Sequence, residues 1–330
     1  MATVITNLLS AIPVFGQDIV ESYNINTNTY NVMLYLSNII PVLTTIGTVS
    51  PHALKKGRKL RLNKEEYLSI PYPFIAFLVG FIDGDGYIQI TKTTKGFITI
   101  KLVIGLSLED ISSLEYIRSI LKIGIISIDR DRLNPTCKLV INKTDLQEIF
   151  FPLLVHHNIY FLTKTRRAQF DLAIYIFKNN IKSYSEIAHY GIERGTWETQ
   201  NIPSIYKLPN FYEDYLKLFF FKNWLVGFTS AEGSFFIKAN NDGCFQLKQR
   251  IHIELFEALK LNFETKRSIS IENNKYAQFS VSSKKDVQNV INFFSFSGLH
   301  PLVGKKYIQY LIWLNNLQNS SRYKTLNFPK

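Results

Sequence analysis

LVGFIDGDG at residues 78–86 and LVGFTSAEG at residues 225–233 are the two segments that decide how this chain folds. Five of their nine positions are identical, and Asp85 in the first segment is matched by another acid, Glu232, in the second. Similarity between segments of one chain indicates repeated structural units. The sequence therefore predicts two related halves, each of which places one carboxylate at an equivalent position.

The residues around each segment predict the same order of elements. In the first half, alternating polar and apolar residues are typical of strands with one buried face. Expected strands cover residues 87–91, 97–104, 125–129 and 136–141. Expected helices end at residue 86, cover 108–121 and begin near Thr144, which can form a capping box with Gln147.

The second half repeats this order with similar spacing. Strands are expected at residues 234–238, at 245–249 and in a hairpin around Asn273 and Asn274, and helices at 254–261 and from Ser283. Each half thus reads αββαββα, which predicts an α+β fold made of two pseudo-symmetric domains. We expect a first domain over residues 66–182, a linker over 183–210 and a second domain over 211–330, preceded by a separate segment at 1–65.

Small residues within the repeated segments predict that their helices pack against each other. Gly80 and Gly84 are four residues apart, as are Gly227 and Ala231, so each helix has a stripe without large side chains. Glycines at 86 and 233 are expected to end the helices in the left-handed conformation. Pairing of the two stripes would bring Asp85 and Glu232 to the same end of the interface.

Two carboxylates at helix C-termini indicate a bound cation. The helix dipole places partial negative charge at this end, and neighbouring carboxylates repel each other. A divalent ion held by Asp85, Glu232 and the carbonyl oxygens of Gly84 and Ala231 would offset both effects. Mg²⁺, or Mn²⁺, suits these oxygen ligands and can activate water in phosphodiester cleavage. The alternative is that both acids are only solvated or capping residues.

Composition narrows the class of partner. The formal net charge is +12 and the sequence pI is 9.4, which indicates a polyanionic partner. The two cysteines, Cys137 and Cys244, form no metal-binding or disulfide motif. The apolar stretch 32–49 is interrupted by polar residues and proline, so we expect no stable membrane association.

The two nonapeptides resemble the LAGLIDADG motif of homing endonucleases and of the related intron maturases. The resemblance covers about residues 66–325 and is closest to single-chain members that carry two motifs. It implies two curved antiparallel sheets that form a saddle over double-stranded DNA. It also implies a monomer that cleaves DNA across the minor groove with a divalent metal.

The resemblance further implies one lysine near the scissile phosphate late in each half. Lys164 and Lys306, which follow Asp85 and Glu232 by 79 and 74 residues, are the candidates. Gln249 matches a polar active-site position of the family, whereas its counterpart in the first half is Leu106. The two cleavage sites are therefore expected to differ chemically.

A second departure from the family pattern is Ser230, which stands where the motif has its earlier acid and where the first copy has Asp83. This earlier acid is not the metal ligand, so the difference puts helix packing or capping in doubt rather than cleavage.

Sequence readout is expected from the polar face of each sheet. Side chains alternate along a strand, and hydrogen-bonding groups can distinguish base pairs in the major groove. The candidate DNA-binding residues are Gln89, Thr91, Thr99 and Lys101 in the first half and Ser234, Lys238, Gln246 and Lys248 in the second.

The beginning of the chain suggests a genetic context. Residues 2–21 resemble a piece of mitochondrial cytochrome b, which implies an intron reading frame continuous with its upstream exon and a location in the mitochondrion. Three functions remain open: a DNA endonuclease, a maturase that binds its group I intron RNA, and a DNA-binding regulator without catalysis.

Overall fold

The computed structural model describes residues 61–131, 133–187, 204 and 206–329. The predictions for residues 2–21 and 32–49 lie outside these described residues. Within the described part, the helices are all too short or too polar to cross a bilayer.

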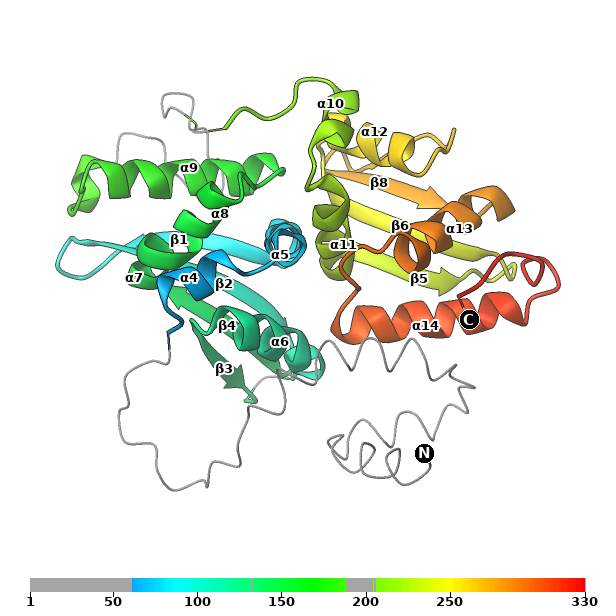
Figure 1. Cartoon of the computed structure of the whole chain (residues 1–330), viewed down its shortest axis with the longest axis horizontal. Coiled ribbons are helices and arrows are strands. Elements are labelled where there is room, and N and C mark those ends of the chain that lie inside the picture. The colour runs from blue at the N-terminus through cyan, green and yellow to red at the C-terminus, as the bar shows by residue number, and fades with distance from the viewer. Residues whose placement is uncertain (1–60, 132, 188–203, 205, 330) are drawn as a thin grey trace. The chain divides into compact units, whose positions relative to one another are not determined.

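The first half follows the predicted order of elements (Figure 1). Its helical elements are α4 (Lys64–Leu68), α5 (Tyr72–Asp85), η1 (Leu108–Asp110), α6 (Ile111–Leu121), α7 (Lys143–Asp145), η2 (Leu146–Phe150), α8 (Phe151–His156) and α9 (Lys164–Lys178). Its strands are β1 (Gly86–Lys92), β2 (Ile98–Ser107), β3 (Ile125–Asp129) and β4 (Thr136–Asn142). They form one antiparallel sheet in the order β1-β2-β4-β3.

The second half has the same topology. Its helical elements are α10 (Tyr212–Lys217), α11 (Phe221–Glu232), α12 (Ile253–Asn262), α13 (Lys284–Ile291), η5 (Asn292–Phe296) and α14 (Gly304–Gln318). Its strands are β5 (Gly233–Ile237), β6 (Gly243–Arg250), β7 (Ser270–Glu272) and β8 (Tyr276–Val281), in the order β5-β6-β8-β7. The predicted α+β fold with two related αββαββα units is therefore confirmed.

Each sheet has one covered face and one open face. Along β4, buried and partly exposed residues alternate, and the buried side chains join the core. Helices α6 and α9 pack against the first sheet, and α12, α13 and α14 pack against the second. The polar residues of each strand remain on the opposite face, because successive side chains point to opposite sides of a sheet.

Two local predictions were wrong. Gly86 and Gly233 end their helices in an extended conformation, with φ of −96° and −76°, rather than in the left-handed one. Glycine is needed there for space, because a Cβ at Gly86 would lie 2.7 Å from a methyl carbon of Ile82. Thr144 does not cap its helix: the side chain of Asn142 accepts the bond from the backbone N–H of Asp145 instead.

The helices α5 and α11 pack with their backbones in contact between the two sheets (Figure 1). A Cβ added at Gly80 would overlap the carbonyl oxygen of Trp224 and lie 2.9 Å from the nitrogen of Phe228. A Cβ at Gly227 would overlap the carbonyl oxygen of Phe77 in the same way. The predicted packing of the two glycine stripes is thus observed, and it is nearly symmetric.

Gly80→Ala or Gly227→Ala should destabilise the protein by about 3 kcal/mol, because a methyl group must displace a main-chain carbonyl rather than a flexible side chain. Urea unfolding would measure the loss. Gly105→Ala is the matched control, since its Cβ would meet only Lys138 Cγ at 3.7 Å, and it should change stability by less than about 1 kcal/mol. Equal effects of all three substitutions would contradict the close helix contact.

A buried carboxylate connects three elements at this interface. Asp83, which is 2% exposed, accepts hydrogen bonds from the indole N–H of Trp224 at 2.8 Å and from the backbone N–H of Leu162, also at 2.8 Å. The backbone N–H and the hydroxyl of Thr163 donate to its other oxygen. The carboxylate therefore joins α5 to α11 and to the start of α9.

The second half lacks the carboxylate of this network and both of its side-chain donors. Ser230 takes the place of Asp83, and its hydroxyl donates within its own helix to the carbonyl of Val226. The residue equivalent to Trp224 is Phe77, and the residue equivalent to Thr163 is Val303. The departure at Ser230 is thus matched at two side chains, because the indole and hydroxyl donors that Asp83 accepts from have no counterpart in Phe77 and Val303.

Asp83→Ala should lower the free energy of unfolding by about 3 kcal/mol or more, because buried donors of three residues lose their acceptor. Chemical denaturation would measure the effect. Ser230→Ala, at the equivalent position, should cost less than about 1 kcal/mol. A large loss of stability in Ser230→Ala, or none in Asp83→Ala, would contradict the role of Asp83 as the shared acceptor of these hydrogen bonds.

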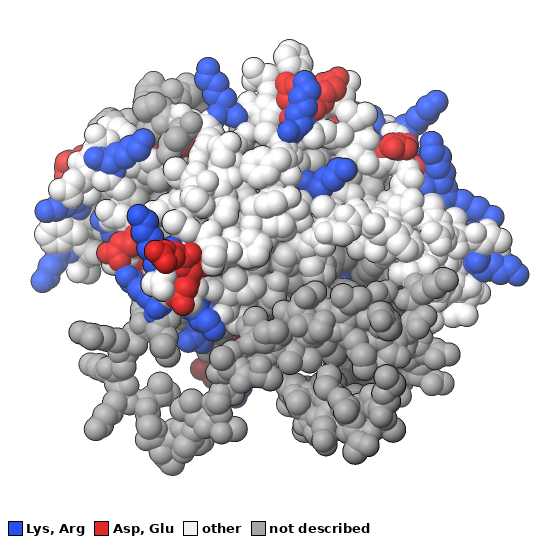
Figure 2. Space-filling model, in the orientation of Figure 1, with Lys and Arg blue, Asp and Glu red and all other residues white. Residues whose placement is uncertain are grey.

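Charged side chains are spread over the surface. On the face shown in Figure 2, Lys and Arg side chains are scattered, some of them beside Asp or Glu, and form no single continuous patch. On this face the positive charge therefore does not by itself locate a binding site.

Candidate active site

Asp85 and Glu232 are the last residues of α5 and α11, and the packing of these helices brings them together. A Cβ at Gly84 would lie 3.0 Å from Glu232 Cγ, so the glutamate side chain extends over the end of the neighbouring helix. Both acids are partly buried. The structure thus assembles the pair of carboxylates that the repeat suggested.

The surroundings of the two acids disfavour their negative charge. Burial, followed by the charge of Asp110, raises the pKa of Asp85 to about 6. Burial, followed by the charge of Asp85, raises the pKa of Glu232 to about 7. Lys306 and Arg166 oppose both shifts only in part. A cation placed between the acids would stabilise their charged forms.

The donor atoms at this position fit a hard divalent cation. Among the described residues, no three His, Cys, Asp or Glu side chains are placed to form a closed metal site. Two carboxylates are available, together with terminal helix carbonyls such as those of Gly84 and Ala231, which have no partner within their helices. Mg²⁺ commonly binds to few protein oxygens and completes its shell with water and phosphate.

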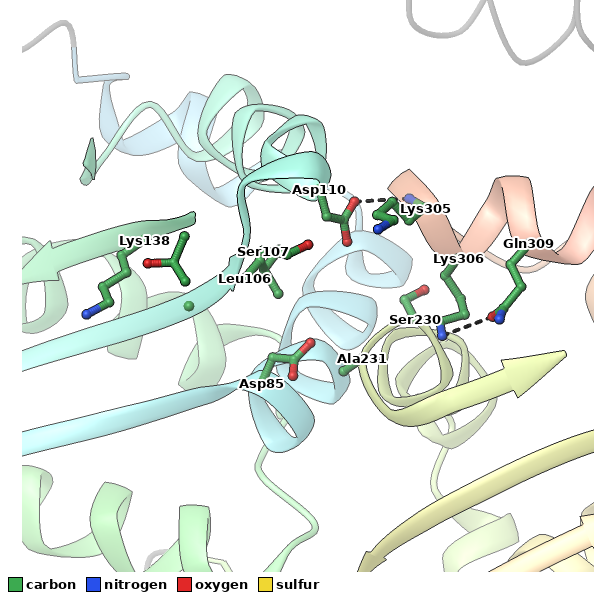
Figure 3. A pocket seen from close by; sticks show the side chains of 12 residues that line it. Asp85, Leu106, Ser107, Asp110, Lys138, Ser230, Ala231, Lys305, Lys306 and Gln309 are labelled. Carbon is green, nitrogen blue, oxygen red and sulfur yellow. Dashed lines mark hydrogen bonds between the residues drawn. The ribbon is translucent and has the colours of Figure 1, made fainter. Parts of the chain in front are cut away.

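A pocket of about 580 Å³ opens beside Asp85 (Figure 3). Asp85 and Leu106 of the first half line it together with Lys306 of the second half. In Figure 3, Asp85 and Lys306 lie on either side of Ala231. The ammonium of Lys306 donates to the carbonyl of Gly233, which fixes it next to the helix ends.

A second pocket of about 170 Å³ lies beside Glu232. The side-chain amide of Gln249 donates to a carboxylate oxygen of Glu232 at 2.6 Å, whereas Leu106 offers no such group to Asp85. Arg166 of the first half also lines this pocket, and its guanidinium donates to the carbonyl of Ile82 at 3.3 Å. Each acid therefore shares a pocket with a cationic side chain from the other half.

The prediction that Lys164 is the counterpart of Lys306 was wrong. Lys164 is the first residue of α9 and Lys306 is the third residue of α14, so the equivalent residue is Arg166. The side chain of Lys164 is 65% exposed and lies 3.8 Å from Glu254, at the rim of the pocket. Aligning Leu162 with Leu302 in the sequence would have identified Arg166.

Seven of the eight candidate readout residues lie on the open faces of the two sheets, and Lys238 does not. Gln89 is paired with Lys101 and Thr91 with Thr99 across β1 and β2, and Ser234 is paired with Gln246 across β5 and β6. Lys248 forms an ion pair with Glu272 on the same face. Lys238 follows the end of β5 and lies in the turn to β6.

Comparison with solved structures shows the same fold. The LAGLIDADG meganuclease I-CpaMI, solved bound to uncleaved DNA, is 20% identical with a TM-score of 0.53, over 76% of this chain and 94% of that one. I-AabMI, also bound to uncleaved DNA, is 22% identical with a TM-score of 0.52, over 77% of this chain and 99% of that one.

Two kinds of curated protein are similar in sequence. A probable intron-encoded endonuclease, aI3, of Dictyostelium discoideum is 22% identical over 249 residues, which are 75% of this chain and 96% of that protein. Cytochrome b of Mycena viridimarginata is 38% identical over 81 residues, or 22% of this chain, and cytochrome b of Strobilurus tenacellus matches equally. The chain spans about a fifth of the length of these cytochromes.

The sequence model of the LAGLIDADG endonuclease matches this chain twice, at residues 78–176 and 225–317. Both matches begin in a motif helix and extend into the last long helix of the same half. The chain therefore belongs to the LAGLIDADG endonuclease family, as a member that carries two copies of the motif.

Proposed function

We propose that this protein is a metal-dependent, site-specific double-strand DNA endonuclease in which Asp85 and Glu232 hold divalent cations. The observation that carries this proposal is the convergence of two partly buried acids at the ends of paired helices, each with its own adjoining pocket. One acid for each DNA strand would explain why the motif is repeated.

The residues around each acid suggest a division of labour during hydrolysis. Bound Mg²⁺ or Mn²⁺ would supply an activated water and stabilise the leaving oxygen. The cationic groups of Lys306 and Arg166 would stabilise charge that develops on the phosphate, and Gln249 would fix the orientation of Glu232. The pocket of Asp85, with Leu106 in place of an amide, would hold its carboxylate less firmly.

Three variants should distinguish the two half-sites: Asp85→Asn, Glu232→Gln and the double variant that combines them. Each single variant should nick plasmid DNA instead of linearising it, and the double variant should lose at least about 100-fold in rate, because removal of a metal ligand removes the chemistry at one strand. A supercoiled plasmid carrying the uninterrupted cytochrome b exon junction would be the substrate, with Mg²⁺ present.

Glu115→Gln is the matched control, because Glu115 is an exposed acid on α6 that lines neither pocket. It should cut at the rate of the original protein. Undiminished cutting by the double variant would refute the assignment of the two acids.

Arg166→Met and Lys306→Met should each slow strand cleavage by about 100-fold with little loss of DNA binding, since a donor aimed at developing charge acts mainly on the rate. Lys164→Met should change the rate less than about fivefold, because this lysine is mostly exposed at the rim. Single-turnover cleavage and a separate binding assay would measure both quantities. A larger effect at Lys164 than at Arg166 would instead support Lys164 as the counterpart of Lys306.

Double-stranded DNA is the partner that we propose for the two open sheet faces. Their readout residues would be Gln89, Thr91, Thr99, Lys101, Ser234, Lys238, Gln246 and Lys248. Because one chain supplies both acids and both sheets, we propose that it acts as a monomer. The domains would cover residues 66–182 and 211–330, joined by a linker at 183–210 and preceded by the separate segment 1–65.

Similarity to cytochrome b and to an intron-encoded endonuclease supports an origin inside a mitochondrial cytochrome b intron, and hence a location in the mitochondrion. The resemblance of the two motifs to those of intron maturases is the ground for a second role that we propose, that of a maturase that binds group I intron RNA. RNA binding does not require Asp85 or Glu232. The double variant should therefore still promote splicing of precursor RNA if this role exists, and loss of splicing together with cutting would argue against a separate RNA surface.

A further inference from the structure

One row of apolar side chains crosses the open face of the first sheet. The strand register places Tyr87 opposite Val103, Val103 opposite Val140, and Val140 opposite Ile125, so the row spans β1, β2, β4 and β3. Ile125 is 60% exposed and Tyr87 is 38% exposed, while Val103 forms the floor of the row at 5%. These four side chains lie outside the hydrophobic core cluster of the described residues, although Val103 is buried.

Polar rows border this apolar row on both sides. In register, they are Gln89, Lys101 and Asn142 on one side and Gly105, Lys138 and Ser127 on the other. The two lysines give the face a positive charge, which suits the phosphates that flank a DNA groove. An uncharged strip between hydrogen-bonding strips therefore faces the space that the proposed function assigns to DNA.

The equivalent row of the second sheet is polar throughout. Ser234 is paired with Gln246, and Gln246 is paired with Ser280. These positions correspond to Tyr87, Val103 and Val140 through the repeated motif and the shared strand order. The two sheets thus present different chemistry in this row, and in the second sheet the apolar residues of the same face, Phe236 and Cys244, are paired in the neighbouring row.

We propose that the apolar row of Tyr87, Val103, Val140 and Ile125 recognises thymine methyl groups in the major groove of the half-site bound by the first sheet. This inference rests on the proposed DNA-binding function. The C5 methyl of thymine is the apolar group that base pairs display in the major groove, and apolar side chains contact it. The row Ser234, Gln246 and Ser280 would instead read hydrogen-bonding edges in the other half-site.

Replacing thymine by uracil tests this proposal, because uracil keeps every hydrogen-bonding group and loses only the methyl. The bound sequence would first be selected from random DNA, and Gln89→Ala would show which half-site the first sheet contacts. Without divalent metal, so that no cutting occurs, each contacted uracil in that half-site should weaken binding by about fourfold. Uracil at base pairs of the other half-site contacted by Ser234, Gln246 and Ser280 should change binding less than about twofold.

Variants of the apolar row provide a second test of the proposal. Ile125→Ser with Val140→Asn should remove the preference for thymine over uracil at the base pairs that β3 and β4 contact, while Tyr87 and Val103 keep it elsewhere. Ile128→Ser is the matched control on the same strand, because Ile128 points to the opposite face and is 44% exposed. It should keep the preference.

The outcomes separate this inference from the function on which it rests. A protein that selects a DNA sequence but tolerates uracil throughout the first half-site, or selects no thymine there, refutes the apolar readout alone. A protein that selects no DNA sequence refutes the proposed function and the readout with it.

Discussion

The main-chain contact between α5 and α11 is the constraint on which the rest of the structure depends. Helices separated by ordinary side chains lie about 8–10 Å apart, whereas Gly80 and Gly227 leave no side chain between the two backbones. This approach fixes the separation of Asp85 and Glu232 at the helix ends. It also fixes the positions of both sheets, because β1 and β5 begin at the very next residues, Gly86 and Gly233.

Much of this arrangement could be predicted from sequence, because the repeated motif marks the end of an equivalent helix in each half. The helix pair, the meeting of the acids and the order of elements along the chain all follow from spacing and alternation, whereas the order of strands within each sheet was not predicted. The wrong predictions concern the space around a side chain and the exact position of a residue along a helix. Gly86 serves to avoid Ile82 rather than to adopt a left-handed conformation, and Lys164 precedes the true counterpart of Lys306 by two residues. Arg166 was not predicted because the family pattern implies a lysine at this position.

The two halves have diverged in sets of contacting residues. Asp83, Trp224 and Thr163 form one hydrogen-bonded set. In the second half Ser230 bonds within its own helix, and the side chains of Phe77 and Val303 have no hydrogen-bonding group. Changing one member alone would leave a buried polar group without a partner, which costs more than the lost bond itself. Packing of this kind explains how a duplicated fold can become asymmetric without loss of stability.

Each acid lies beside a cationic side chain from the other half, which limits how independently the two halves could function. Lys306 of the second half adjoins Asp85, and Arg166 of the first half adjoins Glu232. In the proposed mechanism neither half carries a complete hydrolytic centre, although each carries a full motif. Recombining halves from different relatives would therefore preserve an intact centre only if the acid of one half met a cationic side chain at the equivalent position of the other. The two halves would then depend on each other, rather than act as two copies of one working unit.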